Sequence, residues 1–211
     1  MFKKLIELEM SDNDDNETEI KEIENETENQ IKQEELHYLN RQWDLWYHDP
    51  NNSDYSLSSY INIGTIDTIE RFWHYFHQLK LTQLQNGMFF IMLKGIFPTW
   101  EDNLQGGFWS FKIDKKEISQ AWTKLSIYLL ADNFIDDTDP ELKKEIIGVS
   151  ISPKKTFSIL KVWLNNDSLN KKIKLKSDLP FINIEETMYR SHVETKEKEG
   201  QIKNSTVEFQ I

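Results

Sequence analysis

The chain has 211 residues, no cysteine and a formal net charge of −11 at pH 7. A chain of this length is expected to form one domain whose core needs no disulfide staples, and the lack of cysteine excludes a disulfide scaffold and a thiolate zinc site. No apolar stretch approaches the roughly 18 residues that span a bilayer, so a membrane partner is not expected.

The negative charge is concentrated at the N-terminal end. Residues 1–35 hold ten Glu, three Asp and four Lys, a balance of −9, which leaves −2 for the other 176 residues. High charge with few apolar residues predicts a disordered acidic tail, or a helix that forms only transiently, and such a tail keeps the chain soluble. The folded domain is expected to cover residues 36–211. Because that domain is nearly neutral, the overall acidity does not exclude an RNA partner.

Strand and helix signals alternate along this domain. Strands are predicted at 43–47 and 60–65, and a helix follows near Asp67, where an N-cap acceptor and Glu70 have capping-box spacing. Next come strands at 88–93 and 108–113 and a helix at 117–130, with apolar residues at helical spacing. The remaining predictions are strands at 146–151 and 156–164, a short helix at 169–176, and strands at 182–190 and 207–210.

Many strands and few helices predict an α+β fold. We expect an antiparallel sheet of about eight strands with about three helices on one face. The opposite face of such a sheet is then open to a ligand.

Seven tryptophans lie in this domain, and one differs from the others in its surroundings. Four have apolar neighbours and are predicted to be core residues, namely Trp43, Trp46, Trp109 and Trp122. Trp100 instead lies in a loop with Gly and Pro, where binding residues are common. Its indole offers a stacking face, and Glu101 can accept two hydrogen bonds from guanine. A guanine methylated at N7 is positively charged and gains a cation–π contact.

The sequence resembles the cap-binding translation initiation factor 4E family over about 175 residues. Six motifs occur in order: 37–46 (HYLNRQWDLW), 67–73 (DTIERFW), 95–102 (GIFPTWED), 106–109 (GGFW), 159–163 (ILKVW) and 189–192 (YRSH). The resemblance implies a curved sheet with helices on the convex face and a pocket for the 7-methylguanosine cap of messenger RNA on the concave face. It also implies that the convex face binds a helical motif of factor 4G-type scaffold proteins or of other 4E-binding proteins.

Within the cap pocket, the resemblance implies three base-contacting residues: Trp100, Glu101 and Trp163. The second stacking aromatic falls on Ser56 when residues are counted back from Trp73. Because serine cannot stack, Tyr55 is preferred with a shift of one residue, and Tyr60 is nearby. Tyr55 could instead only pack or face solvent.

The phosphate-binding residues differ from the family pattern. Phe108 stands where the family has a basic residue, and Lys154 falls on the main clamp arginine, with Lys155 beside it. Lysine lacks the planar two-pronged grip of arginine, so phosphates should contribute less affinity and the salt dependence should be shallow. The alternative is that the two lysines form only a solvated turn.

The convex face is implied to bind its partner through five residues: His37, Leu39, Ile69, Trp73 and Ile127. Thr123 and Lys124 replace the family's Leu-Glu, which implies a different partner motif or weaker binding. The resemblance implies recruitment of messenger RNA for translation initiation in the cytoplasm, with the nucleus as a second location. A translational repressor, or a chain that retains only the protein-binding face, are the alternatives.

An enzyme is not expected. Glu101 and Asp102 form a carboxylate pair, but adjacent carboxylates on one loop rarely oppose each other as glycoside hydrolysis requires. The five histidines lack the spacing of metal ligands or of a nucleophile's partners. We therefore expect no catalytic residue, no metal and no cofactor, and a monomer.

Overall fold

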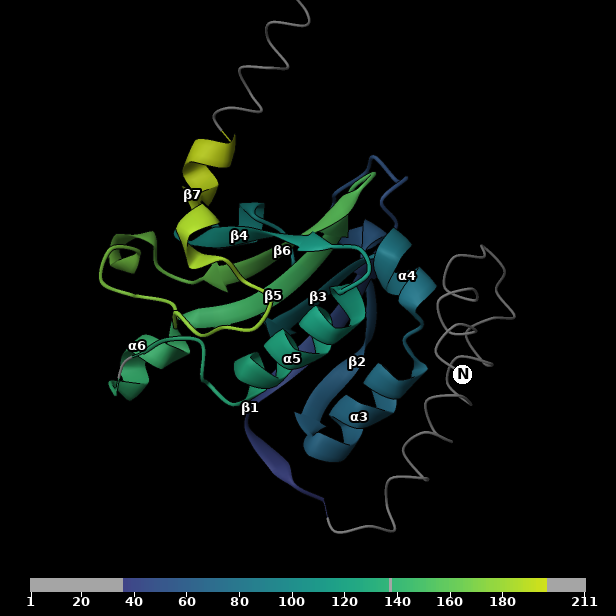
Figure 1. Cartoon of the computed structure of the whole chain (residues 1–211), viewed down its shortest axis with the longest axis horizontal. Helices are drawn as coiled ribbons and strands as arrows, with labels where there is room; N and C mark the ends of the chain where they lie inside the picture. Colours follow the sequence, from purple (N-terminus) through teal and green to yellow (C-terminus); the bar gives the residue numbers. More distant parts are fainter. Residues whose placement is uncertain (1–35, 137, 197–211) are drawn as a thin grey trace, which may run out of the picture.

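The computed structural model describes residues 36–136 and 138–196, and the predicted tail and the predicted strand at 207–210 lie outside them. Within the described part, seven strands form one sheet in the order β2-β1-β3-β5-β6-β4-β7, and all neighbours are antiparallel (Figure 1). The strands are β1 (Tyr38–His48), β2 (Ile61–Thr68), β3 (Met88–Leu93), β4 (Gly107–Asp114), β5 (Ile146–Pro153), β6 (Phe157–Leu164) and β7 (Met188–Ser191).

The longer helices cover one face of this sheet, with α5 lying across its middle (Figure 1). The helices are α3 (Ile69–Gln78), α4 (Leu81–Asn86), α5 (Ile118–Leu130) and α6 (Pro140–Lys144). Residues 192–196, directly after β7, are helical as well. The α+β prediction is confirmed, and so are the two longer helices. The N-cap of α3 is Thr68 and not Asp67, because the Thr68 side chain accepts the hydrogen bond from the Arg71 N–H. The helices α4 and α6 were not predicted, because segments of six and five residues are too short to show helical periodicity.

Two predicted elements near the C-terminal end were wrong. The segment 169–176 is not a helix: a 3₁₀ turn at Asp167–Leu169 is followed by further turns. Its apolar residues are Leu169, Ile173 and Leu175. The last two are two positions apart, which is strand-like spacing, and Leu175 forms an isolated bridge to Ile135. The strand predicted at 182–190 is reduced to β7, because the Asn183 side chain caps a 3₁₀ turn at its start.

Apolar side chains gather on both faces of the sheet. The main core lies under the helices, where the Phe76 ring of α3 stacks on Trp122 of α5 with centroids 6.1 Å apart. A second cluster lies on the concave face and consists of Trp46, Tyr60, Phe90, Met92, Ile147 and Trp163. The four tryptophans predicted as core are buried, and Trp46 belongs to this second cluster. The open face therefore has an apolar floor.

Replacing Trp122 by alanine should lower the free energy of unfolding by about 3–5 kcal/mol, because its fully buried side chain leaves a cavity between α3 and α5. Trp73→Ala is the matched control. Trp73 lies on α3 with 37% of its surface exposed, so its loss should cost about 1 kcal/mol or less. Urea denaturation measures both, and equal losses would contradict this placement of the two side chains.

Candidate functional site

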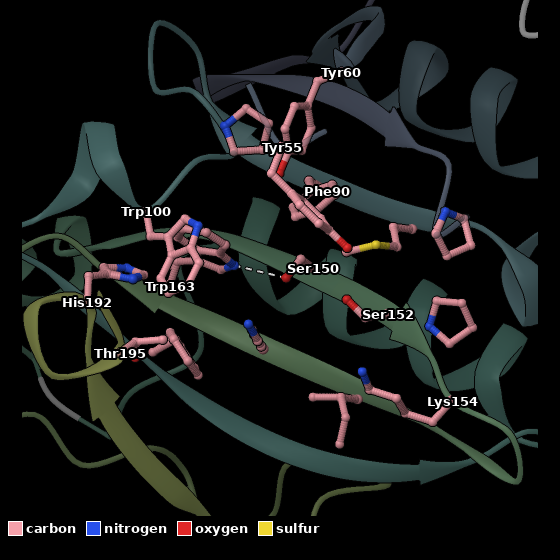
Figure 2. A pocket seen from close by; sticks show the side chains of 17 residues that line it. Tyr55, Tyr60, Phe90, Trp100, Ser150, Ser152, Lys154, Trp163, His192 and Thr195 are labelled. Atoms are coloured by element: carbon pink, nitrogen blue, oxygen red, sulfur yellow. Dashed lines mark hydrogen bonds between the residues drawn. The ribbon is translucent and has the colours of Figure 1, made fainter. Parts of the chain in front are cut away.

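Two adjoining cavities on the concave face share Tyr55 and Trp100 in their walls. The larger has a volume of about 440 Å³, and the smaller has a volume of about 380 Å³. Figure 2 shows the larger cavity, with Trp163, Ser150 and Ser152 along its strands and the aromatic rings of Tyr55 and Trp100 above them. Residues from several segments that are distant in the sequence thus converge on one hollow.

The loop that carries Trp100 is braced from within. Trp100 lies between β3 and β4 and precedes a 3₁₀ turn. The Thr99 hydroxyl donates a hydrogen bond to the Asp102 carboxylate, and the Asn103 side-chain amide donates to the Thr99 carbonyl. The Asn103 backbone N–H donates to the Trp100 carbonyl at 3.0 Å. These bonds hold the half-buried indole in place without a ligand.

The two adjacent carboxylates have different surroundings. Asp102 is bonded to Thr99, whereas Glu101 is exposed at the wall of the smaller cavity beside Trp100. Burial raises the pKa of Tyr60, and the negative charge of Glu101 contributes in the same direction. Glu101 is therefore a hydrogen-bond acceptor at the edge of the space between Tyr55 and Trp100.

Tyr55 lies flat against a buried histidine. Its ring stacks on His48 with centroids 4.7 Å apart and an interplanar angle of 12°, and 45% of its surface is exposed. The neighbouring Ser56 bonds within the loop, because its N–H and its hydroxyl both donate to Asp54 and lower the pKa of that carboxyl. Tyr55 lines both cavities, whereas Ser56 lines only the smaller one. The Tyr60 ring also contacts His48, with ring centroids 4.6 Å apart.

Trp163 forms part of the floor of the larger cavity. It pairs with Phe108 on β4 and with Gly148 on β5, and 4% of its surface is exposed. Its indole N–H donates to the Ser150 hydroxyl at 2.9 Å, drawn as a dashed line in Figure 2. Because this polar atom is already bonded, Trp163 offers the cavity an apolar ring surface.

The lysines of the site are distributed unequally. Lys154 is exposed and lines the larger cavity, whereas Lys155 is exposed in the turn between β5 and β6 and lines neither cavity. Lys161 also lines the larger cavity, and sequence reasoning did not identify it. The available signal was its position two residues before Trp163 in the same strand, which puts both side chains on one face.

His192 is a second residue of the larger cavity that sequence reasoning missed. Its ring is fully buried, with centroids 5.0 Å from Trp163 and 5.4 Å from Phe108, and neither ring nitrogen has a hydrogen-bond partner in the described structure. Burial and, to a smaller extent, the positive charge of Lys161 together lower the pKa of His192 to about 4. The imidazole is therefore neutral at pH 7.

The five residues predicted for partner binding lie along the opposite side of the sheet. His37 Nδ1 lies 2.7 Å from Glu70 Oε1, and its backbone N–H donates to Glu70 Oε2. These hydrogen bonds lower the pKa of the Glu70 carboxyl to about 2 and tie the entry of β1 to α3. Leu39 is half-buried against the core. The exposed members are His37, Ile69, Trp73 and Ile127.

Within residues 36–136 and 138–196, no three His, Asp or Glu side chains are grouped to hold a metal ion. No helix in that part of the chain combines the length and the apolar character needed to cross a membrane.

Comparisons with known proteins agree on one family. The model for eukaryotic initiation factor 4E matches residues 38–207. The chain is 28% identical to translation initiation factor 4E-2 of Schizosaccharomyces pombe, over 81% of this chain and 72% of that protein. It is 25% identical to translation initiation factor 4E of Xenopus laevis, over 78% of this chain and 81% of that protein. A solved complex of C. elegans eIF4E-3 with the 4E-binding protein Mextli and a cap analogue has a TM-score of 0.65 at 21% identity, covering 77% of this chain and 96% of that chain.

The buried His192 makes a prediction about stability and pH. Its pKa of about 4 in the folded state lies below the value of about 6.5 for an unperturbed histidine, so the unfolded chain binds more protons between these pH values. Stability should therefore fall as the pH is lowered through this window, by up to about 3 kcal/mol from this one group.

The variant His192→Phe should have a shallower dependence of unfolding free energy on pH between 6.5 and 4. Urea unfolding at a series of pH values measures it in both proteins. The carboxylates titrate in both, so the difference between the two curves isolates His192. Parallel curves would contradict a neutral, buried imidazole.

Proposed function

The chain belongs to the eukaryotic initiation factor 4E family, and on that premise we propose that it binds the 7-methylguanosine cap of messenger RNA in the concave cavities. The observation that carries this proposal is the position of Tyr55 and Trp100, which line both cavities, with Glu101 at the edge and Trp163 on the floor. The chain acts by recognition, with no chemical step.

In this proposal the methylated base stacks between Tyr55 and Trp100. Glu101 accepts hydrogen bonds from N1–H and the exocyclic amine of guanine, and charge-assisted bonds of this kind are strong. The N7-methyl group contacts the apolar ring of Trp163. The base is cationic, so the aromatic rings attract it, and the neutral His192 adds no opposing charge behind Trp163.

The cap phosphates are proposed to meet lysines at the edge of the larger cavity. Lys154 lines that cavity and is the nearer of the two lysines predicted from sequence. Lys155 is farther out, in the turn, and is proposed to act on the phosphates only at longer range. Both are point charges on flexible stems, so each phosphate contact adds modest affinity.

On the convex face we propose a site for an amphipathic helix of a factor 4G-type scaffold or another 4E-binding protein. The exposed Trp73 and Ile69 on α3 and Ile127 on α5 supply the apolar anchors such a helix needs. The stacked pair of Phe76 and Trp122 joins the two helices beneath them. The related C. elegans protein was solved with a 4E-binding protein, which supports this kind of partner.

Binding both ligands would recruit capped messenger RNA for translation initiation in the cytoplasm, with the nucleus as a second location. A repressor would use the same two surfaces with a different partner. Lys124 is exposed on α5 where the family pattern has an acidic residue, and this difference favours a partner with its own charge pattern. We also propose that the domain acts as a monomer, begins at residue 36 and follows a solubilising tail over residues 1–35.

The cap proposal is tested by titrating the protein with m7GTP and with GTP. The methylated nucleotide should bind about 30-fold more tightly, since a desolvated cation–π contact contributes about 2 kcal/mol. Trp100→Ala should weaken m7GTP binding by about 10- to 100-fold through lost stacking. Phe97→Ala is the matched control, because Phe97 is an exposed aromatic of the same loop that lines neither cavity. Equal binding of the two nucleotides would refute the proposed function.

The partner site is tested with Trp73→Ala. A helical peptide from a factor 4G-type scaffold should bind this variant at least about 10-fold more weakly, because a buried tryptophan anchor contributes about 2 kcal/mol or more. Binding of m7GTP should stay unchanged. Leu81→Ala, an exposed leucine on the neighbouring α4, serves as the control in isothermal titration calorimetry. If both variants bind the peptide equally well, the partner lies elsewhere.

A further inference from the structure

Lys161 occupies the row of the concave face next to Trp163. In β6 the two residues are two positions apart, so their side chains point to the same face about 7 Å from each other. Trp163 pairs with Phe108 on β4, and Lys161 pairs with Ser110 on β4 and Ser150 on β5. The strand register therefore puts an ammonium group beside the floor of the larger cavity, which Lys161 lines.

The ammonium of Lys161 rests on an aromatic ring of the neighbouring strand. Its Nζ lies 4.1 Å from the centroid of Phe108, which is itself buried. Phe108 is the position where the sequence resemblance leads one to expect a basic residue. The positive charge expected at position 108 is therefore supplied by Lys161 on the next strand, and the Lys161 ammonium lies over the Phe108 ring.

We propose that Lys161, seated on Phe108, is the principal residue that binds the phosphates of the cap. This inference rests on the proposed function and goes beyond it, because it moves the phosphate site from the turn of Lys154 and Lys155 to the middle of the sheet.

The chemistry of the ligand favours this position. The five-membered ring of guanine carries the methyl group at N7 and the ribose at N9. A base whose methyl group contacts Trp163 therefore holds its ribose near Trp163, which puts the phosphates within reach of the neighbouring residues of the cavity floor. Lys161 is the next residue on that face of β6, and its charge already lowers the pKa of His192 on the cavity wall.

The contact with the Phe108 ring also makes Lys161 a better phosphate ligand than Lys154. An ammonium held over an aromatic face samples fewer conformations, so less conformational entropy is lost when it binds a phosphate. Lys154 follows the end of β5 with an exposed side chain, so fixing it costs more conformational entropy.

The chain contains a closely matched control. Lys112 lies on the same face, pairs with Ile159 and has its Nζ 4.7 Å from the centroid of the Phe157 ring. It is a lysine with the same kind of aromatic contact, but it does not line the larger cavity.

The experiment titrates wild type, Lys161→Ala, Lys112→Ala and Lys154→Ala with m7GMP, m7GDP and m7GTP at several salt concentrations. Lys161→Ala should weaken m7GTP binding about tenfold, reduce the gain from each added phosphate, and lower the salt slope by about 1. Lys112→Ala should stay within about twofold of wild type, and Lys161→Arg should retain tight binding.

Lys161→Met removes the charge but keeps a long side chain that can pack on Phe108. It replaces the alanine variant in the titrations if that variant does not fold. A loss of m7GTP affinity in the Met variant supports the inference. Affinity equal to wild type, or a larger loss in Lys154→Ala, would overturn it. If wild type itself fails to prefer m7GTP over GTP, the proposed function fails instead, so the two failures are distinguishable.

Discussion

The antiparallel register of β5, β6 and β4 is the constraint on which the concave face depends. It aligns Gly148, Trp163 and Phe108 in one row across the sheet and Ser150, Lys161 and Ser110 in the next. Since side chains alternate along a strand, a slip of one residue would turn Trp163 and Lys161 into the core and expose apolar residues in their place. The hydrogen bond from the Trp163 indole to Ser150 belongs to this register, because it joins one row to the next across two strands.

The same alternation lets one sheet support two unrelated surfaces. Large apolar side chains on the convex side hold α3 and α5, and the stacked Phe76 and Trp122 leave Trp73 outside the core. On the concave side a smaller cluster forms a floor without closing the face. Binding on one side therefore need not disturb packing on the other.

Local patterns in the sequence predicted most of the fold. The helix at Ile118–Leu130 and the six longer strands could be predicted because each shows its periodicity over enough residues. The helix predicted at 169–176 was wrong because the few apolar residues of that segment fit a strand as well as a helix. Trp100 could be singled out because its loop setting is visible in the sequence. Lys161 could have been found from its position two residues before Trp163, whereas His192 could not, since its burial depends on residues distant in the chain.

The contact between Lys161 and Phe108 makes the two residues depend on each other. Lys161 and the Phe108 ring beneath its ammonium come from neighbouring rows of two adjacent strands, so the contact crosses the sheet diagonally. A basic residue at 108 would instead place two like charges in adjacent positions, where they repel. Such a residue would therefore remove the aromatic ring on which the ammonium of Lys161 lies and add a second positive charge near it.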